Sequence, residues 1–410
     1  MSARHELTLL SLADEPISAA ARAELARFCR IAVVGKLTKV RAVFNLARAL
    51  VDRRPLQQAY YTSPVFGRRL RALIASESFD VIHATYGLRL APYLEGIDPE
   101  RVLLDLTDAQ SLGLRSRRDR TRLPMRWLYD LELRRVERSE RELARRFPHV
   151  VVTGEADRAE LGAPSVTVVR NGVDLGRFEY TNDGRERDLV IMTGNMGYQP
   201  NVDGALWFAA NVWPRVLERR PAARWSIVGA RPATSLRALH GCDNITVVGA
   251  VDDLALRLRG AAVAIAPTLC GAGIQNKVLE AFASGTPVVA TSFANQGVQA
   301  SDGEHLLIAD EPDLFAEHVV TLLENRERGQ ALAHWAHQFV AKNFTWEAHA
   351  TQLERTYERI AATLGGGRVA GPSATAPGPQ IPESAPQAVV AGNRHTARRD
   401  KKDGAITGVA

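Results

Sequence analysis

Residues 266–290 hold the side chains best suited to chemistry in this chain. The apolar run 263–266 predicts a strand, Gly271 and Gly273 predict a loop, and residues 274–284 predict a helix. Glycines let the backbone approach a ligand closely, and the unpaired amides at a helix start favour an anion. This order of elements predicts a diphosphate site.

Lys277 and Glu280 are three residues apart and therefore share one face of the predicted helix. The ammonium group adds a full positive charge beside the diphosphate, and the carboxylate can accept both hydroxyls of a ribose. Such a pair taken alone is usually an ordinary surface ion pair. The preceding strand and glycines, with Gly285 and Pro287 closing the helix, favour a nucleotide site instead.

Short apolar runs separated by helix-length segments recur along the chain, as in parallel sheets covered by helices. The first set of predicted strands comprises residues 7–11, 31–34, 81–84, 102–106, 150–153 and 166–169. After the turn dipeptide Asn171-Gly172, a second set comprises residues 189–193, 225–228, 245–248, 263–266, 288–291 and 306–308. The sequence predicts an α/β fold with two doubly wound, Rossmann-like domains and a site where carboxyl ends of strands face a cleft.

The composition argues against several classes of protein. A chain of 410 residues with 46% apolar content can bury two cores, and its net charge of +6 is gathered in clusters, unlike the continuous basic stripe of a nucleic-acid-binding protein. Cys29, Cys242 and Cys270 are too scattered for a disulfide framework, and no metal-ligand spacing is present. No membrane-spanning run or signal peptide is evident. We expect a cytoplasmic protein without a metal or cofactor and without a nucleic-acid partner.

The pattern Gly-x-Gly-Ile-x-x-Lys-x-x-Glu-Ala, followed by Gly-x-Pro-Val-Val-Ala, resembles the donor-site motif of glycosyltransferase family 4, retaining enzymes of GT-B fold. Further matches are the run Asn171 to Asp174 with Phe178, Thr193-Gly194, Pro200-Asn201 and Asp302-Gly303. The resemblance covers about residues 166–364. It implies transfer of a sugar from a nucleotide diphosphate sugar to a hydroxyl acceptor with retention, the acceptor being a polysaccharide, a glycolipid or a polyprenyl-linked glycan.

The resemblance also implies roles for individual residues. Glu280 would hold the donor ribose, Lys277 the diphosphate, and the glycine loop the sugar and phosphate, with no metal and no assigned catalytic base. The predicted donor-binding residues are Gly194, Asn195, Arg231, Gly271, Ala272, Gly273, Ile274, Gln275, Lys277 and Glu280.

Three positions depart from the family pattern. Ala272 stands where the family usually has the first glutamate of a Glu-x7-Glu pair, so backbone amides of residues 273–275 are expected to hold the sugar, whose identity stays open. Asn195 and Asn201 stand where an arginine and a lysine are common. We interpret Asn201 as the N-cap of a helix over residues 202–217, and Arg231 as a candidate cation for the diphosphate.

The amino-terminal half is expected to bind the acceptor. Residues 4–10 resemble the family's second strand, so the first strand, its glycine loop and the first helix are expected upstream of Met1 or are absent. The predicted division is an acceptor-side domain over 1–170, a donor domain over 171–345, a returning helix over 346–364 and a disordered basic tail over 365–410.

His83 lies at the end of one predicted strand of this half and Asp108 follows another. Both are acceptor-side candidates, although single polar residues of this kind more often cap a turn or lie satisfied at an edge. Six arginines between Arg115 and Arg126, with a helix over 126–147, either contact anionic membrane lipid peripherally or form a solvated face.

Three alternatives remain at this point. A nucleotide-sugar epimerase of GT-B fold would share the donor half but would need acids and bases in its cleft. A dinucleotide-dependent oxidoreductase fits poorly, since Asn276 stands where its fingerprint requires glycine or alanine and Thr291-Ser292 replace the expected acid. A degenerate partner subunit would bind a nucleotide sugar without turnover.

Overall fold

The computed structural model describes residues 4–12, 17–34 and 39–364. They form two compact units. The smaller unit contains a parallel pair of strands, β1 (Thr8–Leu12) and β2 (Arg30–Val34), with α1 (Ala19–Leu25), α2 (Lys39–Asp52) and α4 (Pro64–Ser76). The predicted tail over 365–410 lies outside the described residues.

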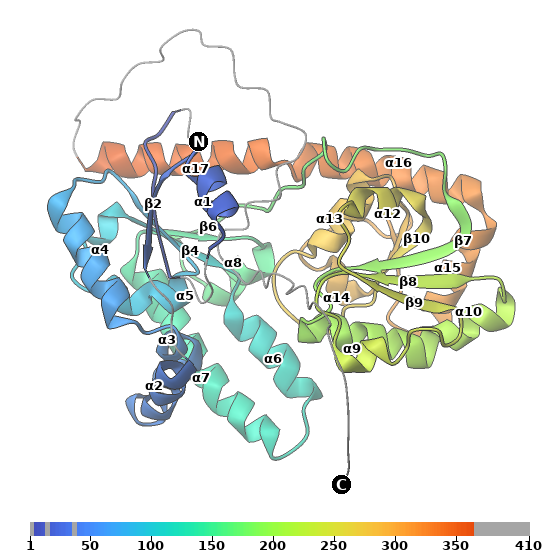
Figure 1. Ribbon diagram of the computed structural model, residues 1–410, viewed down its shortest axis with the longest axis horizontal. Coiled ribbons are helices and arrows are strands. Elements are labelled where there is room, and N and C mark those ends of the chain that lie inside the picture. Colours follow the sequence, from blue (N-terminus) through green and yellow to red (C-terminus); the bar gives the residue numbers. More distant parts are fainter. Residues whose placement is uncertain (1–3, 13–16, 35–38, 365–410) are drawn as a thin grey trace, which may run out of the picture. The chain divides into compact units, whose positions relative to one another are not determined.

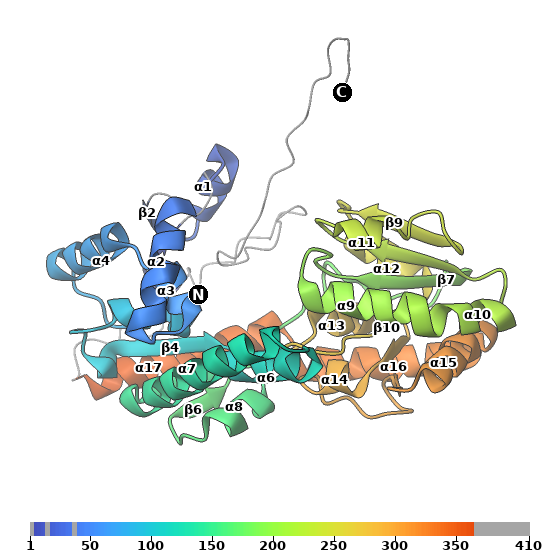
Figure 2. The same cartoon turned by 90° about the horizontal axis from the view of Figure 1, so that it is seen from below.

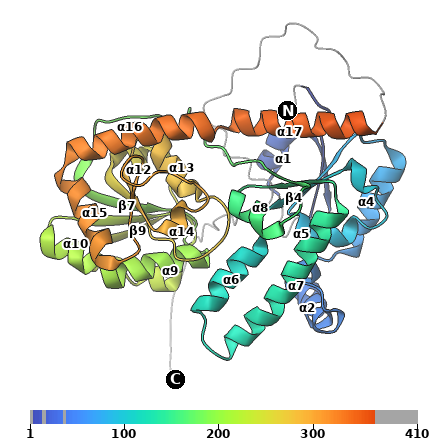
Figure 3. The same ribbon diagram turned by 180° about the vertical axis from the view of Figure 1, so that it is seen from behind.

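The larger unit contains a four-stranded and a six-stranded sheet, and every pairing in them is parallel. The four-stranded sheet has the order β3-β4-β5-β6, with β3 (Ile82–Thr85), β4 (Val102–Thr107), β5 (His149–Val152) and β6 (Val166–Val168). Its helices are α5 (Gly87–Leu90), α6 (Gln110–Arg120), α7 (Met125–Arg146) and α8 (Glu155–Leu161), and its core includes Leu104, Leu143 and Val150. α6 and α7 run side by side and are joined at one end by a short loop (Figures 1 and 3).

The six-stranded sheet has the order β12-β11-β10-β7-β8-β9. Its strands are β7 (Glu186–Thr193), β8 (Arg224–Val228), β9 (Ile245–Gly249), β10 (Ala261–Ala266), β11 (Val288–Ala290) and β12 (Leu307–Ile308). Its helices are α9 (Gln199–Trp207), a π-helical turn (Phe208–Val212), α10 (Trp213–Arg219), α11 (Thr234–Arg237), α12 (Leu254–Gly260), α13 (Asn276–Ala283), α14 (Ser292–Asn295), α15 (Pro312–Glu324) and α16 (Arg326–Asn343).

Alternation along the strands of this sheet builds a core on each face. Val263 and Ile265 of β10 pack with α9, α10 and α15, whereas Ala264 and Ala266 pack with α12, α13 and α16. Figure 2 shows α9 and α10 in line with each other along one side. Helices on both faces of a parallel sheet leave the carboxyl ends of its strands as the place for a ligand.

The prediction of an α/β fold with parallel sheets is confirmed, and each predicted strand overlaps an observed one. The six strands expected as one amino-terminal set fall into two sheets, since β1 and β2 pair only with each other among the described residues. The remaining helices are α3 (Leu56–Tyr60) and α17 (Trp346–Thr363), together with two short 3₁₀ turns at Ala91–Tyr93 and Pro99–Arg101. Gln352 of α17 donates to the carbonyl of Val168 at 2.6 Å. The domain boundaries stay a prediction.

Candidate functional site

The loop between β10 and α13 is shaped by its glycines. Gly271 has φ 139° and Gly273 has φ 73°, values that L side chains rarely adopt. A Cβ on Gly273 would lie 2.2 Å from Oδ1 of Asp108, so only glycine fits there. α13 then begins at Asn276, and the N-cap residue Gln275 makes no side-chain capping bond. The first amides of α13 are therefore available to an anion.

Lys277 is buried beside this loop, with 9% of its surface exposed. Its ammonium group donates to Oδ1 of Asn201 at 2.6 Å and to Oγ1 of Thr268 at 3.0 Å. Burial lowers the pKa of Lys277 to about 8, against the opposing effect of Glu280. Two polar partners thus hold a cation at the carboxyl end of β10.

The interpretation of Asn201 as a helix N-cap is wrong. α9 begins at Gln199, so Asn201 lies inside its first turn. Its Nδ2 donates to the backbone carbonyl of Asn195 at 3.0 Å while its Oδ1 receives the Lys277 ammonium. The amide side chain therefore connects the end of β7 to α13.

Glu280 lies one helical turn beyond Lys277 and is half-buried. The part of the chain that the structure describes gives its carboxylate no hydrogen-bond partner. Burial raises the pKa of Glu280 to about 7, opposed by Arg177 and Lys277. A carboxylate whose acceptor positions are open is suited to paired hydroxyl groups.

The ends of β7 and β8 supply the next predicted residues. A Cβ on Gly229 would lie 1.6 Å from the carbonyl oxygen of Gly194, so the two backbone segments pass in close contact. Oδ1 of Asn195 accepts the amide of Gly197 at 3.1 Å and closes a turn, which satisfies that oxygen within the chain. Arg231 is exposed and has φ 56°. All three predicted residues of this region lie beyond the carboxyl ends of adjacent strands.

The other loop residues differ in how accessible they are. Ile274 is 9% exposed and packs into the core on the α13 face, so only its backbone is open to a ligand. Oε1 of Gln275 accepts from the Thr268 hydroxyl at 3.4 Å. A Cβ on Gly113 of α6 would lie 3.6 Å from the Cβ of Ala272, which places α6 against the loop.

The two acceptor-side candidates have different surroundings. Asp108 lies against Gly273 and accepts the hydroxyl of Thr153 at 2.8 Å, and burial raises the pKa of Asp108. The ring of His83 is held by the Tyr357 hydroxyl at 2.7 Å and by Asp105 at 3.4 Å. Asp108 is thus brought to the glycine loop, whereas both ring nitrogens of His83 already have protein partners.

Sequence reasoning missed several polar residues of the site, namely Thr268, Arg177, Arg117 and Tyr198. The guanidinium of Arg117 in α6 lies 6.0 Å from the ring centroid of Tyr198, which immediately precedes α9. Burial raises the pKa of Tyr198, and Asp108 acts in the same direction. The pairing crosses between helices of two sheets, and no local sequence pattern encodes such a contact.

The described ranges lack both a metal-binding cluster and a membrane-spanning helix. No group of three or more histidine, cysteine, aspartate or glutamate side chains there is arranged to hold a metal ion. No helix within those ranges is both long and apolar enough to cross a membrane.

Residues 187–325 match the family model described as glycosyl transferases group 1. The matched region contains β7 to β12 and all the predicted donor-binding residues.

Two relatives illustrate the similarity in sequence. An uncharacterized 44.6 kDa protein in the cps region of Klebsiella pneumoniae is 23% identical over 84% of this chain and 89% of its own length. The phosphatidyl-myo-inositol mannosyltransferase of Mycobacterium tuberculosis is 32% identical over 50% of this chain and 56% of its own length. The chain thus spans about half the length of that mannosyltransferase.

Two solved structures show the same fold. Sucrose-phosphate synthase from Thermosynechococcus elongatus aligns with a TM-score of 0.65 at 17% identity, over 88% of this chain and all of that one. The Anabaena protein HepE in complex with UDP-glucose aligns with a TM-score of 0.59 at 13% identity, over 86% of this chain and 99% of that one. The larger unit, with its two parallel sheets flanked by helices, thus has the GT-B fold, and residues 187–325, which contain most of the six-stranded sheet, form a glycosyl transferases group 1 domain.

Proposed function

We propose that the protein transfers a sugar from a nucleotide diphosphate sugar to a hydroxyl acceptor with retention, as in glycosyltransferase family 4. One observation carries the donor half of the proposal. A buried ammonium group stands on α13 one turn from a carboxylate to which the described residues give no hydrogen-bond partner, behind a loop that only glycine can form. This arrangement suits a diphosphate followed by a ribose.

Lys277 would act at the leaving diphosphate. An ammonium group has three donors, and Asn201 and Thr268 take two of them, which leaves one for a phosphate oxygen. Together with the first amides of α13, this donor would stabilise the charge that develops as the sugar leaves. The chain's part in catalysis is then preorganised charge, and neither a metal nor a cofactor is invoked.

The proposed donor contacts extend to the remaining predicted residues. Glu280 would accept hydroxyls of the ribose, and the amides of Gly273 to Gln275 would hold the sugar in place of the carboxylate that Ala272 lacks. Arg231 is a further candidate for the diphosphate. We assign residues 171–345 to donor binding and residues 1–170 to the acceptor, with 346–364 as a returning helix.

The acceptor is proposed to be a polysaccharide, a glycolipid or a polyprenyl-linked glycan. The names of the relatives support this range, since one is a phosphatidyl-myo-inositol mannosyltransferase and another comes from a cps region. Asp108, beside the glycine loop, is the better placed of the two acceptor-side candidates. A lipid-linked acceptor would bring the protein into peripheral contact with an anionic membrane.

Titration calorimetry with UDP and with GDP tests the donor site. We expect Lys277→Ala and Glu280→Gln each to weaken the preferred nucleotide by about 10- to 100-fold, the cost of losing a hydrogen bond to a charged group. Lys342→Ala and Glu304→Gln change exposed residues of the same types and should bind as the unaltered protein does. Folded Lys277 and Glu280 variants with unchanged affinity would refute the assignment.

Stereochemistry is tested separately. The protein is incubated with UDP- and GDP-sugars and an acceptor library, and the product is examined by proton NMR. The transferred sugar should have the same anomeric configuration as in the donor. An inverted product would contradict membership of a retaining family while leaving the donor site intact.

A further inference from the structure

The connection between α6 and α7 exposes a run of large apolar side chains. Residues 122–128 are all exposed, and the exposed fraction is 78% for Leu123, 50% for Met125 and 67% for Trp127. Isolated apolar residues on a surface are ordinary, but a contiguous group marks an interaction site. The loop and the first turn of α7 therefore form an apolar tip, at the end where the two helices meet (Figures 1 and 3).

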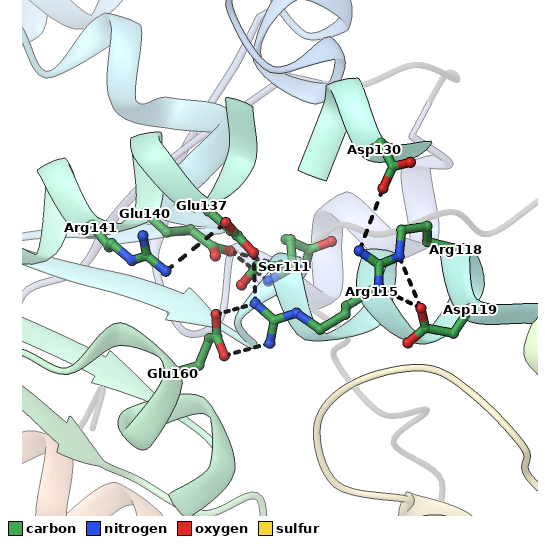
Figure 4. A network of polar contacts seen from close by, with 10 residues as sticks. Ser111, Arg115, Arg118, Asp119, Asp130, Glu137, Glu140, Arg141 and Glu160 are labelled. Carbon is green, nitrogen blue, oxygen red and sulfur yellow. Dashed lines mark hydrogen bonds and ion pairs between the residues drawn. The ribbon is translucent and has the colours of Figure 1, made fainter. Parts of the chain in front are cut away.

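The tip also carries positive charge that no ion pair among the described residues neutralises. The acids nearest to it in sequence, Asp119 and Asp130, both pair with Arg118, at 2.6 and 3.5 Å (Figure 4). Arg115 likewise forms ion pairs with Glu137 and Glu160. Three arginines beside the apolar side chains make no ion pair within the described ranges: Arg120, Arg122 and Arg126. The apolar tip is thus flanked by cations.

α7 continues this charge along its outer face. Trp127 is followed at intervals of seven, four, three and four residues by Arg134, Arg138, Arg141 and Arg145, the spacing of one helix face. All four arginines are exposed, whereas Val136 and Leu143 on the opposite face are buried. Within the described part of the chain, Arg141 is the one member of this row that forms an ion pair, with Glu137 at 4.0 Å. The result is a row of cations, flanked by Glu137 and Glu142, that begins at the apolar tip.

We propose that this combined surface docks on an anionic phospholipid membrane. We call it the α6–α7 surface and define it by Arg122, Leu123, Met125, Arg126, Trp127, Arg134, Arg138, Arg141 and Arg145. Tryptophan and the aliphatic side chains would enter the headgroup region, and the arginines would pair with lipid phosphates. An extended basic row ending in apolar side chains fits a broad anionic sheet better than a compact acidic protein.

The proposal deepens the proposed function, because it names the surface by which a transferase acting on a lipid-linked acceptor would reach the membrane. Docking is measured without donor or acceptor. Failure of docking therefore leaves the donor assignment untouched, and failure of nucleotide binding leaves the docking result untouched.

Flotation of the full chain with vesicles tests the proposal. We expect flotation with phosphatidylcholine vesicles containing phosphatidylglycerol, weak flotation with phosphatidylcholine alone, and release by salt. The triple variant Arg134→Gln, Arg138→Gln, Arg145→Gln should reduce partitioning by about tenfold or more. The double variant Leu123→Ser, Trp127→Ser should reduce partitioning to anionic vesicles without changing the salt dependence of that partitioning.

The matched control is Arg187→Gln, Arg219→Gln, Arg257→Gln, which removes three exposed arginines of the donor-side half. It should float as the unaltered protein does. Both test variants should keep the circular dichroism spectrum and the melting temperature of the unaltered protein, which shows that they are folded. Equal flotation of the test and control variants overturns the proposal, as does a lack of flotation of the unaltered chain, the result expected if the surface serves an acidic protein.

Discussion

At the scale of single residues, the site combines the ammonium of Lys277 with the carboxylate of Glu280, and both groups change protonation near neutral pH. Lys277 and Glu280 were predictable, because their spacing and the glycines before them form a local pattern. Thr268 and Asn201, which hold the Lys277 ammonium, were not, since Asn201 lies 76 positions away in sequence and meets Lys277 only when β7 and β10 pair. A side chain that fixes another across a sheet leaves no signal in a local pattern.

These pKa values predict how donor binding depends on pH. In the proposed donor site the Lys277 ammonium binds the diphosphate, and its pKa is about 8, so affinity should fall as pH rises through 8. The Glu280 carboxylate is proposed to bind the ribose, and its pKa is about 7, so that contribution should fall as pH drops through 7. UDP affinity should therefore be highest between these values.

Comparing UDP with 2′-deoxy-UDP isolates the carboxylate, because phosphate ionisation is the same in both. The preference for UDP should shrink below pH 7 and should be small at every pH in Glu280→Gln. A preference that stays constant from pH 5.5 to 8.5 would contradict the role given to Glu280.

At the scale of elements, the strands were predictable and the helix boundaries less so. Each short β-branched run became a strand, because a parallel sheet covered on both faces selects for such runs. The helix predicted over 202–217 instead starts at Gln199 and passes through a π-helical turn before Pro214, whose missing N–H cannot continue the ladder. The start of α6 was also hidden, because its caps come from distant elements.

Those caps predict a pH-dependent stability. Glu140 of α7 accepts the amide of Gln110 at 2.6 Å, and Asp157 of α8 accepts that of Ala109 at 2.9 Å. Burial raises the pKa of each carboxyl to about 7, above its value in the unfolded chain. The stability linked to each group is thus full below its unfolded-state pKa, 4.5 for Glu140 and 3.8 for Asp157, and is lost as pH rises through 7.

Glu140→Gln removes the ionisation and keeps the acceptor oxygen. Between pH 5 and pH 8 we expect the unaltered protein to lose about 2 to 3 kcal/mol of unfolding free energy relative to this variant, since one pKa unit corresponds to about 1.4 kcal/mol. Urea unfolding at several pH values measures the difference. Glu142→Gln changes an exposed residue on the same helix, and its unfolding free energy should depend on pH as that of the unaltered protein does. Identical pH dependence in the Glu140→Gln and Glu142→Gln variants would contradict the role given to Glu140.

At the scale of the whole molecule, the six-stranded sheet has a core on each face, and the residues proposed to bind the donor lie beyond the ends of its strands. A nucleotide bound there should slow local opening around its contacts more than elsewhere. Hydrogen exchange with saturating UDP should show protection in residues 193–202 and 266–283, with little change in β3 and β6. Protection confined to the four-stranded sheet would place the nucleotide elsewhere.

The contact between Gly273 and Asp108 also has a consequence for inheritance. The side-chain oxygen of Asp108 occupies the space that any Cβ at position 273 would need. Because Gly273 also has φ 73°, a conformation that L side chains rarely adopt, a change at Asp108 alone would not free position 273 for a larger residue. Descendants of this chain should therefore keep glycine at position 273 even where position 108 has changed.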